Sequence, residues 1–129
     1  MGKLRFVQAG TVRKELADGE DWIEIKERLS YGEQQRLAGG ALGKASGMLT
    51  GNIEVPFDFE QYEILRMFLW ITDWSFTNER GKEVKVTRAA LANLDPDVAE
   101  EISAIIVAHI EEREAQKKVT DGESESSST

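Results

Sequence analysis

The chain has 129 residues, with 16 Lys and Arg against 24 Asp and Glu, a formal net charge of -8 at pH 7, and no cysteine. This length fits one domain with one core. The acidic balance argues against a nucleic-acid or anionic-membrane partner, because phosphate binding needs clustered Lys and Arg. The missing cysteine excludes disulfides, thiolate chemistry and Cys-based metal sites.

No stretch of the chain approaches the roughly 20 consecutive apolar residues that a membrane span needs. The N-terminal segment also lacks an apolar core of signal-peptide length. We therefore expect a soluble, cytoplasmic protein.

The first predicted elements are two short strands, at 11–16 and 22–27. An Asp18-Gly19 turn joins them, because glycine adopts positive φ at little cost. A β-hairpin therefore opens the domain, and residues 1–10 are an N-terminal extension.

A capping box follows the hairpin. The Ser30 hydroxyl can accept from the Glu33 N–H while the Glu33 carboxylate reaches back to the Ser30 N–H, which predicts a helix from about Tyr31. Glycines weaken this helix progressively, since each costs up to about 1 kcal/mol relative to Ala in a helix interior. We expect the stretch 39–52 to be mobile or to end in a loop; its glycines are Gly39, Gly40, Gly43 and Gly47.

A tryptophan-rich apolar segment forms the predicted central helix, from its N-cap at Asp58 through Trp74 to the polar turn at 77–82. Its apolar residues cover almost the whole circumference of the helix. Such a helix must be buried on two sides, either in a core or against a partner.

Two further caps predict the remaining helices. Thr87 precedes a short helix at 88–94, and Asp95 precedes Pro96 at the favoured first position of a helix that runs to about Lys117. Residues 119–129 carry nothing to bury and are predicted to be a disordered acidic tail. The last helix has one apolar stripe, made of Val98, Ile102, Ile105, Ile106, His109 and Ile110.

These elements predict an α+β fold that is mainly α-helical. A small N-terminal β-hairpin is followed by about four helices and the disordered acidic C-terminal tail. One globular domain covers residues 11–118.

Catalytic groups are scarce. His109, the only histidine, lies on an apolar stripe, where a packed or hydrogen-bonded core histidine is the commoner case. One histidine assembles no Ser-His-Asp or metal set, and the glycines at 39–47 do not match a phosphate-binding loop. We therefore predict no enzymatic activity and no catalytic, cofactor-binding or metal-binding residue.

The tryptophans allow two interpretations. Trp22, Trp70 and Trp74 are most simply core residues, because a small domain buries its largest aromatic side chains. Alternatively, Trp70 or Trp74 enters a partner groove, since Trp is enriched at interface hot spots. The sequence leaves both interpretations open.

Three segments carry a family resemblance: DWIEIKERLSYGE at 21–33, FEQYEIL through ITDWSF at 59–76, and GKEVKVTRAALANL at 81–94 followed by DVAEEI at 97–102. Together they resemble small tail-module proteins of long-tailed bacteriophages, and the closest class is the tail assembly chaperone. The resemblance implies a non-enzymatic protein of the host cytoplasm that binds the tape measure protein, with tail tube subunits as a second candidate partner.

An apolar face would bind such a partner, or a second copy of this chain, while the acidic surface keeps the complex dispersed. Two alternatives remain: a head–tail or minor tail subunit retained in the virion, and a small acidic regulatory or inhibitor protein. The predicted partner-binding residues are Phe68, Trp70, Ile71 and Trp74 on the central helix and Ile102, Ile106 and Ile110 on the last helix.

Overall fold

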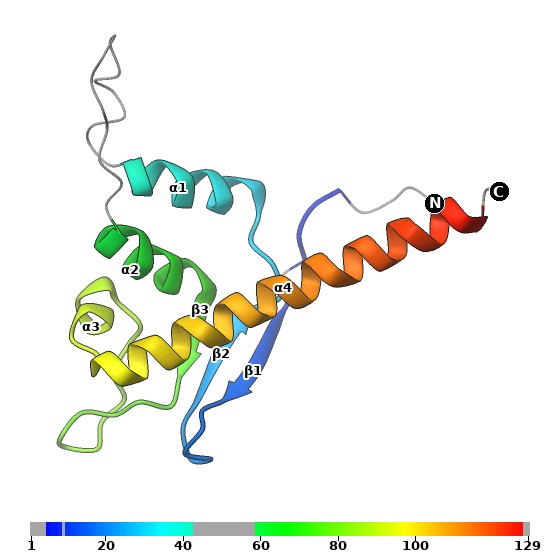
Figure 1. The fold of residues 1–129 in the computed structure, drawn as a ribbon. Helices are drawn as coiled ribbons and strands as arrows, with labels where there is room; N and C mark the ends of the chain where they lie inside the picture. Colours follow the sequence, from blue (N-terminus) through cyan, green and yellow to red (C-terminus); the bar gives the residue numbers. More distant parts are fainter. Residues whose placement is uncertain (1–4, 9, 43–58, 128–129) are drawn as a thin grey trace, which may run out of the picture.

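The structure, a computed structural model, describes residues 5–8, 10–42 and 59–127. It is an α+β fold dominated by helices, as predicted (Figure 1). Within the described ranges a three-stranded antiparallel sheet has the order β1-β2-β3, and α4 crosses one face of it. The elements in chain order are β1 (Thr11–Glu15), β2 (Trp22–Lys26), α1 (Tyr31–Leu42), α2 (Phe59–Trp70), β3 (Ile71–Trp74), α3 (Arg88–Ala92) and α4 (Pro96–Ser127).

The predicted N-terminal hairpin is confirmed. In β1 and β2, Val12 lies opposite Ile25 and Lys14 lies opposite Ile23. The turn between the strands contains Gly19 at a φ of 74°. The Asp18 carboxylate accepts hydrogen bonds from the backbone N–H groups of the turn, at 2.9 Å from residue 21 and 2.8 Å from residue 20. These two bonds, the first being the stronger cause, hold the pKa of Asp18 below its ordinary value.

The central helix is shorter than predicted, because α2 ends at Trp70 and the chain continues as strand β3. Trp74 pairs with Ile23 and Ile71 pairs with Ile25, so that Thr72 is an extra residue in the register. This bulge lets Ile71 and Trp74 face the core together although they are three positions apart. A short apolar run fits a helix or a buried strand equally well, and pairing with the edge of β2 decides for the strand.

Helix α1 begins at the predicted capping box. The Ser30 N–H donates to a Glu33 carboxylate oxygen at 3.0 Å, and the Glu33 N–H donates to the Ser30 hydroxyl at 3.2 Å. The helix continues through Gly39 and Gly40 to Leu42, past the start of the predicted loop. It packs on α2, which supports a helix that its glycines would weaken in isolation. The remaining predicted loop and the Asp58 cap fall outside the described residues.

The caps predicted for the last two helices are confirmed. The Thr87 hydroxyl accepts from the N–H of Ala90 at 3.1 Å, and the Asp95 carboxylate accepts from the N–H of Asp97 at 2.9 Å.

Helix α4 extends to Ser127, beyond the predicted end at Lys117 and through most of the predicted disordered tail. The tail sequence contains no proline, and elongation of an existing helix costs far less than nucleation. From residue 111 onward the described side chains of α4 are exposed, and this part of the helix projects away from the domain (Figure 1). None of the described helices is both long and apolar enough to cross a membrane.

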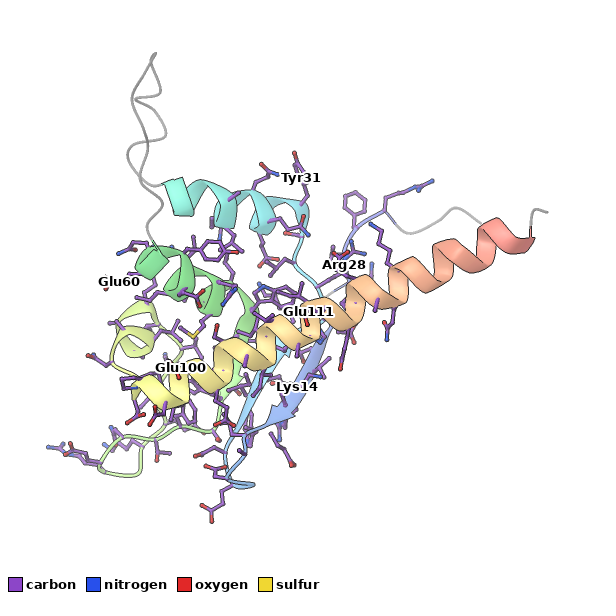
Figure 2. The ribbon with its side chains drawn as sticks, viewed as in Figure 1. Lys14, Arg28, Tyr31, Glu60, Glu100 and Glu111 are labelled. Atoms are coloured by element: carbon purple, nitrogen blue, oxygen red, sulfur yellow. The ribbon has the colours of Figure 1, made fainter. Side chains whose placement is uncertain are left out.

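The core lies between the sheet and the helices. Its fully buried side chains are Ile23 and Ile25 of β2 with Ile102 and Ile106 of α4. On the other side of α4, Glu100 and Glu111 are exposed (Figure 2). The stripe predicted for the last helix is therefore the surface that packs on the sheet.

Candidate functional site

Most of the predicted partner-binding residues are part of the core. Five of the seven are at most 6% exposed, because the domain uses its largest apolar face to cover its own sheet. Their small exposed fractions leave little of each side chain for a partner to contact. The structure therefore corrects the prediction of an exposed face made by these five, which are Trp70, Ile71, Trp74, Ile102 and Ile106.

The other two predicted residues, Phe68 and Ile110, are half-buried and lie apart. The guanidinium of Arg88 stands 5.4 Å from the ring centroid of Phe68 and partly covers it. Ile110 lines a cavity beside the exposed part of α4. Trp70 lines the same cavity, so Trp70 and Ile110 are one predicted pair that the structure brings together, although Trp70 is buried.

An apolar groove runs beside Trp74, between the loop at 76–84, α3 and the first turn of α4. Its volume is about 850 Å³. Six of its twelve lining residues are apolar, and they come from four separate segments of the chain. The apolar side chains that line it are Trp74, Phe76, Val84, Ala90, Leu94 and Val98.

Trp74 holds the loop that forms one wall of the groove. Its indole N–H donates to the Val84 carbonyl at 2.6 Å, and its ring lies 5.0 Å from that of Phe76 between centroids. The loop also closes on itself, since the Asn78 carboxamide oxygen accepts from two backbone N–H groups at 2.8 and 3.1 Å. Gly81 supplies the positive φ, 74°, that this turn needs. These contacts form the wall before any ligand binds.

The polar groups of the groove are acidic or neutral. Asp21, Glu79 and Asp95 line it, and among its described lining residues there is no Lys or Arg. The Asp21 carboxylate accepts from the Ser75 hydroxyl at 3.0 Å, which fixes one acidic group at the rim. An apolar lining with an acidic rim complements an amphipathic segment that carries basic residues.

Sequence reasoning identified one lining residue of this groove, Trp74, and missed the others. The available signal was the helix predicted at 88–94, because Ala90 and Leu94 lie four positions apart and would share a face of that helix. Phe76 and Val84 belong to a loop, where no periodicity marks them. Only the fold brings the loop and the two helices together.

His109 is a core histidine, as predicted. It is 6% exposed, and its Nε2–H donates to the backbone carbonyl of Glu27 at 2.9 Å. In the described residues, no group of three or more His, Asp or Glu side chains is arranged to hold a metal ion.

The chain matches no protein-family model, no curated protein and no solved structure.

Proposed function

We propose that this chain is a non-enzymatic protein-binding factor whose groove takes the apolar face of an amphipathic segment with basic flanks. The observation that supports this function is the combination of an apolar lining with the acidic rim of Asp21, Glu79 and Asp95. The lining would supply most of the affinity through burial of apolar surface. The rim would select segments whose flanking residues are basic.

The partner that we propose is the tape measure protein of a long-tailed bacteriophage, and the proposed role is tail assembly chaperone in the host cytoplasm. The sequence resemblance at 21–33, 59–76 and 81–102 supports this choice. The net charge of -8 also suits a protein that keeps an aggregation-prone partner dispersed.

Co-expression with a tape measure protein, taken from the gene neighbourhood where that neighbourhood encodes one, tests the proposal. Size-exclusion chromatography with light scattering should show a co-eluting complex in the soluble fraction, while the tape measure protein alone aggregates. An aggregated tape measure protein beside free chain would contradict the chaperone role. Recovery of the chain in purified virions would instead favour a structural subunit, and salt-sensitive binding to a basic host protein would favour an inhibitor.

Two alanines of α3 provide a matched pair that locates the site. Ala90 lines the groove, whereas Ala92 is exposed and does not. Ala90→Lys fills part of the groove and places a positive charge opposite the basic flanks of the partner. It should therefore weaken binding about tenfold or more, which corresponds to about 1.4 kcal/mol of binding free energy. Ala92→Lys adds the same charge to the same helix and should bind like the unchanged chain. Equal affinities of the two variants would remove the groove as the site.

A further inference from the structure

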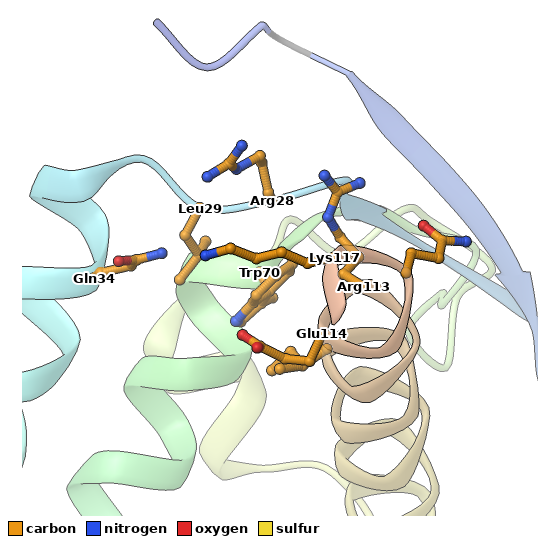
Figure 3. A pocket seen from close by; sticks show the side chains of 9 residues that line it. Arg28, Leu29, Gln34, Trp70, Arg113, Glu114 and Lys117 are labelled. Carbon is orange, nitrogen blue, oxygen red and sulfur yellow. The ribbon is translucent and has the colours of Figure 1, made fainter. Parts of the chain in front are cut away.

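The buried stripe of α4 changes from apolar to basic where the helix leaves the domain. Ile106 and His109 are buried, and Arg113 and Lys117 follow His109 at successive four-residue steps, so all four lie near one face. There the helix borders a second cavity, of about 660 Å³ (Figure 3). This cavity, the basic pocket, lies along α4 from the apolar groove and shares no lining residue with it.

The basic pocket gathers cations that have no partner within the described structure. Arg28 reaches it from the segment between β2 and α1, and Arg113 and Lys117 reach it from α4 (Figure 3). Among the described residues, none of the three forms an ion pair or a hydrogen bond through its side chain. Glu114 is the only carboxylate among the described lining residues. Three cations against one carboxylate attract an anion even on an acidic chain.

The floor of the basic pocket supplies an unused hydrogen-bond donor. Trp70 lines the pocket and is 6% exposed, and its Nε1–H is buried with no acceptor among the described groups. A buried N–H without an acceptor is rare in folded proteins and calls for an explanation. Figure 3 shows the indole nitrogen directed toward the wall of the pocket that carries Glu114. Rotation of Glu114 toward solvent would open a path from the pocket to this N–H.

We propose that the basic pocket binds an Asp or Glu side chain from an acidic peptide segment of a partner protein. Arg113 and Lys117 pair with the carboxylate, Arg28 closes the opposite side, and the indole N–H of Trp70 donates to one carboxylate oxygen. The ligand carboxylate thus competes with Glu114 for the pocket. This site is independent of the groove and of the partner proposed for it.

The chemistry of the pocket favours a peptide carboxylate over a phosphate group. Buried Leu29 and half-buried Ile110 provide an apolar floor, which suits the methylene groups of Asp and Glu. Nucleic acid would need a longer basic track to neutralise several phosphates.

Titration of the full-length ¹⁵N-labelled chain with a hexaglutamate peptide tests the proposal. The indole N–H signal of Trp70, assigned with a Trp70→Phe variant, should shift saturably and should lose this response as salt is raised. Replacing both Arg113 and Lys117 by Gln should weaken binding about tenfold or more. A matched double variant, Arg80→Gln with Lys85→Gln, removes the same charge from exposed positions outside the pocket and should bind nearly as the unchanged chain.

A second matched pair tests the competition by Glu114. Glu114→Gln should tighten hexaglutamate binding severalfold, because it removes both the repulsion and the competing carboxylate. Glu112→Gln, an exposed change outside the pocket lining, should have little effect.

Three results would overturn the assignment. The first is the absence of a saturable shift of the Trp70 signal with hexaglutamate. The second is an equal response to hexalysine, because it would show that charge does not select the ligand. The third is tighter binding of inorganic phosphate or of a short DNA duplex than of hexaglutamate, because the pocket would then recognise phosphate and not a peptide carboxylate.

Discussion

The indole ring of Trp70 meets the imidazole ring of His109 edge to face, with centroids 5.7 Å apart and planes at 80°. The contact joins the end of α2 to α4. The same imidazole donates to the carbonyl of Glu27, just after β2, at 2.9 Å. A single histidine therefore connects the ends of two elements, α2 and β2, to α4, next to Trp70, which lines the basic pocket.

His109→Phe should lower the free energy of unfolding by about 1 kcal/mol. The substitution keeps an aromatic ring beside Trp70 but removes the donor to the Glu27 carbonyl. Urea denaturation measures the difference, and His109→Gln, which can keep a donor, should recover part of it if the hydrogen bond is the cause. A His109→Phe variant as stable as the unchanged chain would mean that water replaces the bond without cost.

Glu33 links α1 to the sheet through Lys26 and caps the helix at Ser30. Partial burial raises the pKa of Glu33, but the hydrogen bonds from Lys26 and from the Ser30 N–H outweigh it and lower the pKa below the ordinary value. A lowered pKa in the folded state means that the ionised form stabilises the fold. This stabilisation is present above the unfolded-state pKa of about 4.3 and is lost as the pH falls through the lower folded value.

Glu33→Gln should therefore cost about 0.5–1 kcal/mol of stability at pH 7. The cost should shrink as the pH falls below about 4. Thermal denaturation across this pH range provides the measurement. Glu112→Gln, at an exposed position of α4, is the control and should change stability little at any pH. A Glu33→Gln deficit that persists in acid would show that the carboxylate charge is not its source.

Two glycines should respond to alanine in opposite directions. Gly81 and Gly32 both have open space where a Cβ would be placed, but Gly81 has a φ of +74° and Gly32 lies in the first turn of α1. Gly81→Ala should destabilise by about 1 kcal/mol through backbone strain. Gly32→Ala should stabilise by up to about 1 kcal/mol, because alanine has the higher helix propensity. Chemical denaturation measures the change in the free energy of unfolding for each variant. Changes of the same sign in both variants would contradict this account.

Trp74→Phe should loosen the wall of the groove. It removes the donor to the Val84 carbonyl, which should cost about 1 kcal/mol, and it should speed hydrogen exchange at two loop amides that form hydrogen bonds, those of Gly81 and Val84. Trp22→Phe is the control. The Arg13 guanidinium carbon lies 3.7 Å from the ring centroid of Trp22, and Trp22 does not hold this loop through its indole N–H. Unchanged exchange at the loop amides of Trp74→Phe would show that the loop holds its shape without the indole.

The sequence by itself determined the features that depend on neighbours in the chain. The hairpin around Gly19 and the helix starts at Ser30, Thr87 and Asp95 were all predicted and are all present. A cap needs only a side-chain oxygen and an N–H two or three positions away, and a tight turn needs only a residue that tolerates positive φ. These local contacts, with the apolar periodicity, were enough to specify the mainly helical α+β class.

The tertiary structure decided which apolar surface is buried and which remains open. The sequence from Ile71 to Trp74 is compatible with a helix or a strand, and pairing with β2 makes it a strand. Because of this pairing, the Trp74 side chain is buried in the core, and its indole holds the loop that forms one wall of the groove. Most of the residues that were predicted to bind a partner are therefore core residues. The groove and the basic pocket each combine segments that are far apart in the sequence. No local sequence pattern predicts that these segments lie together, because their proximity depends on long-range packing.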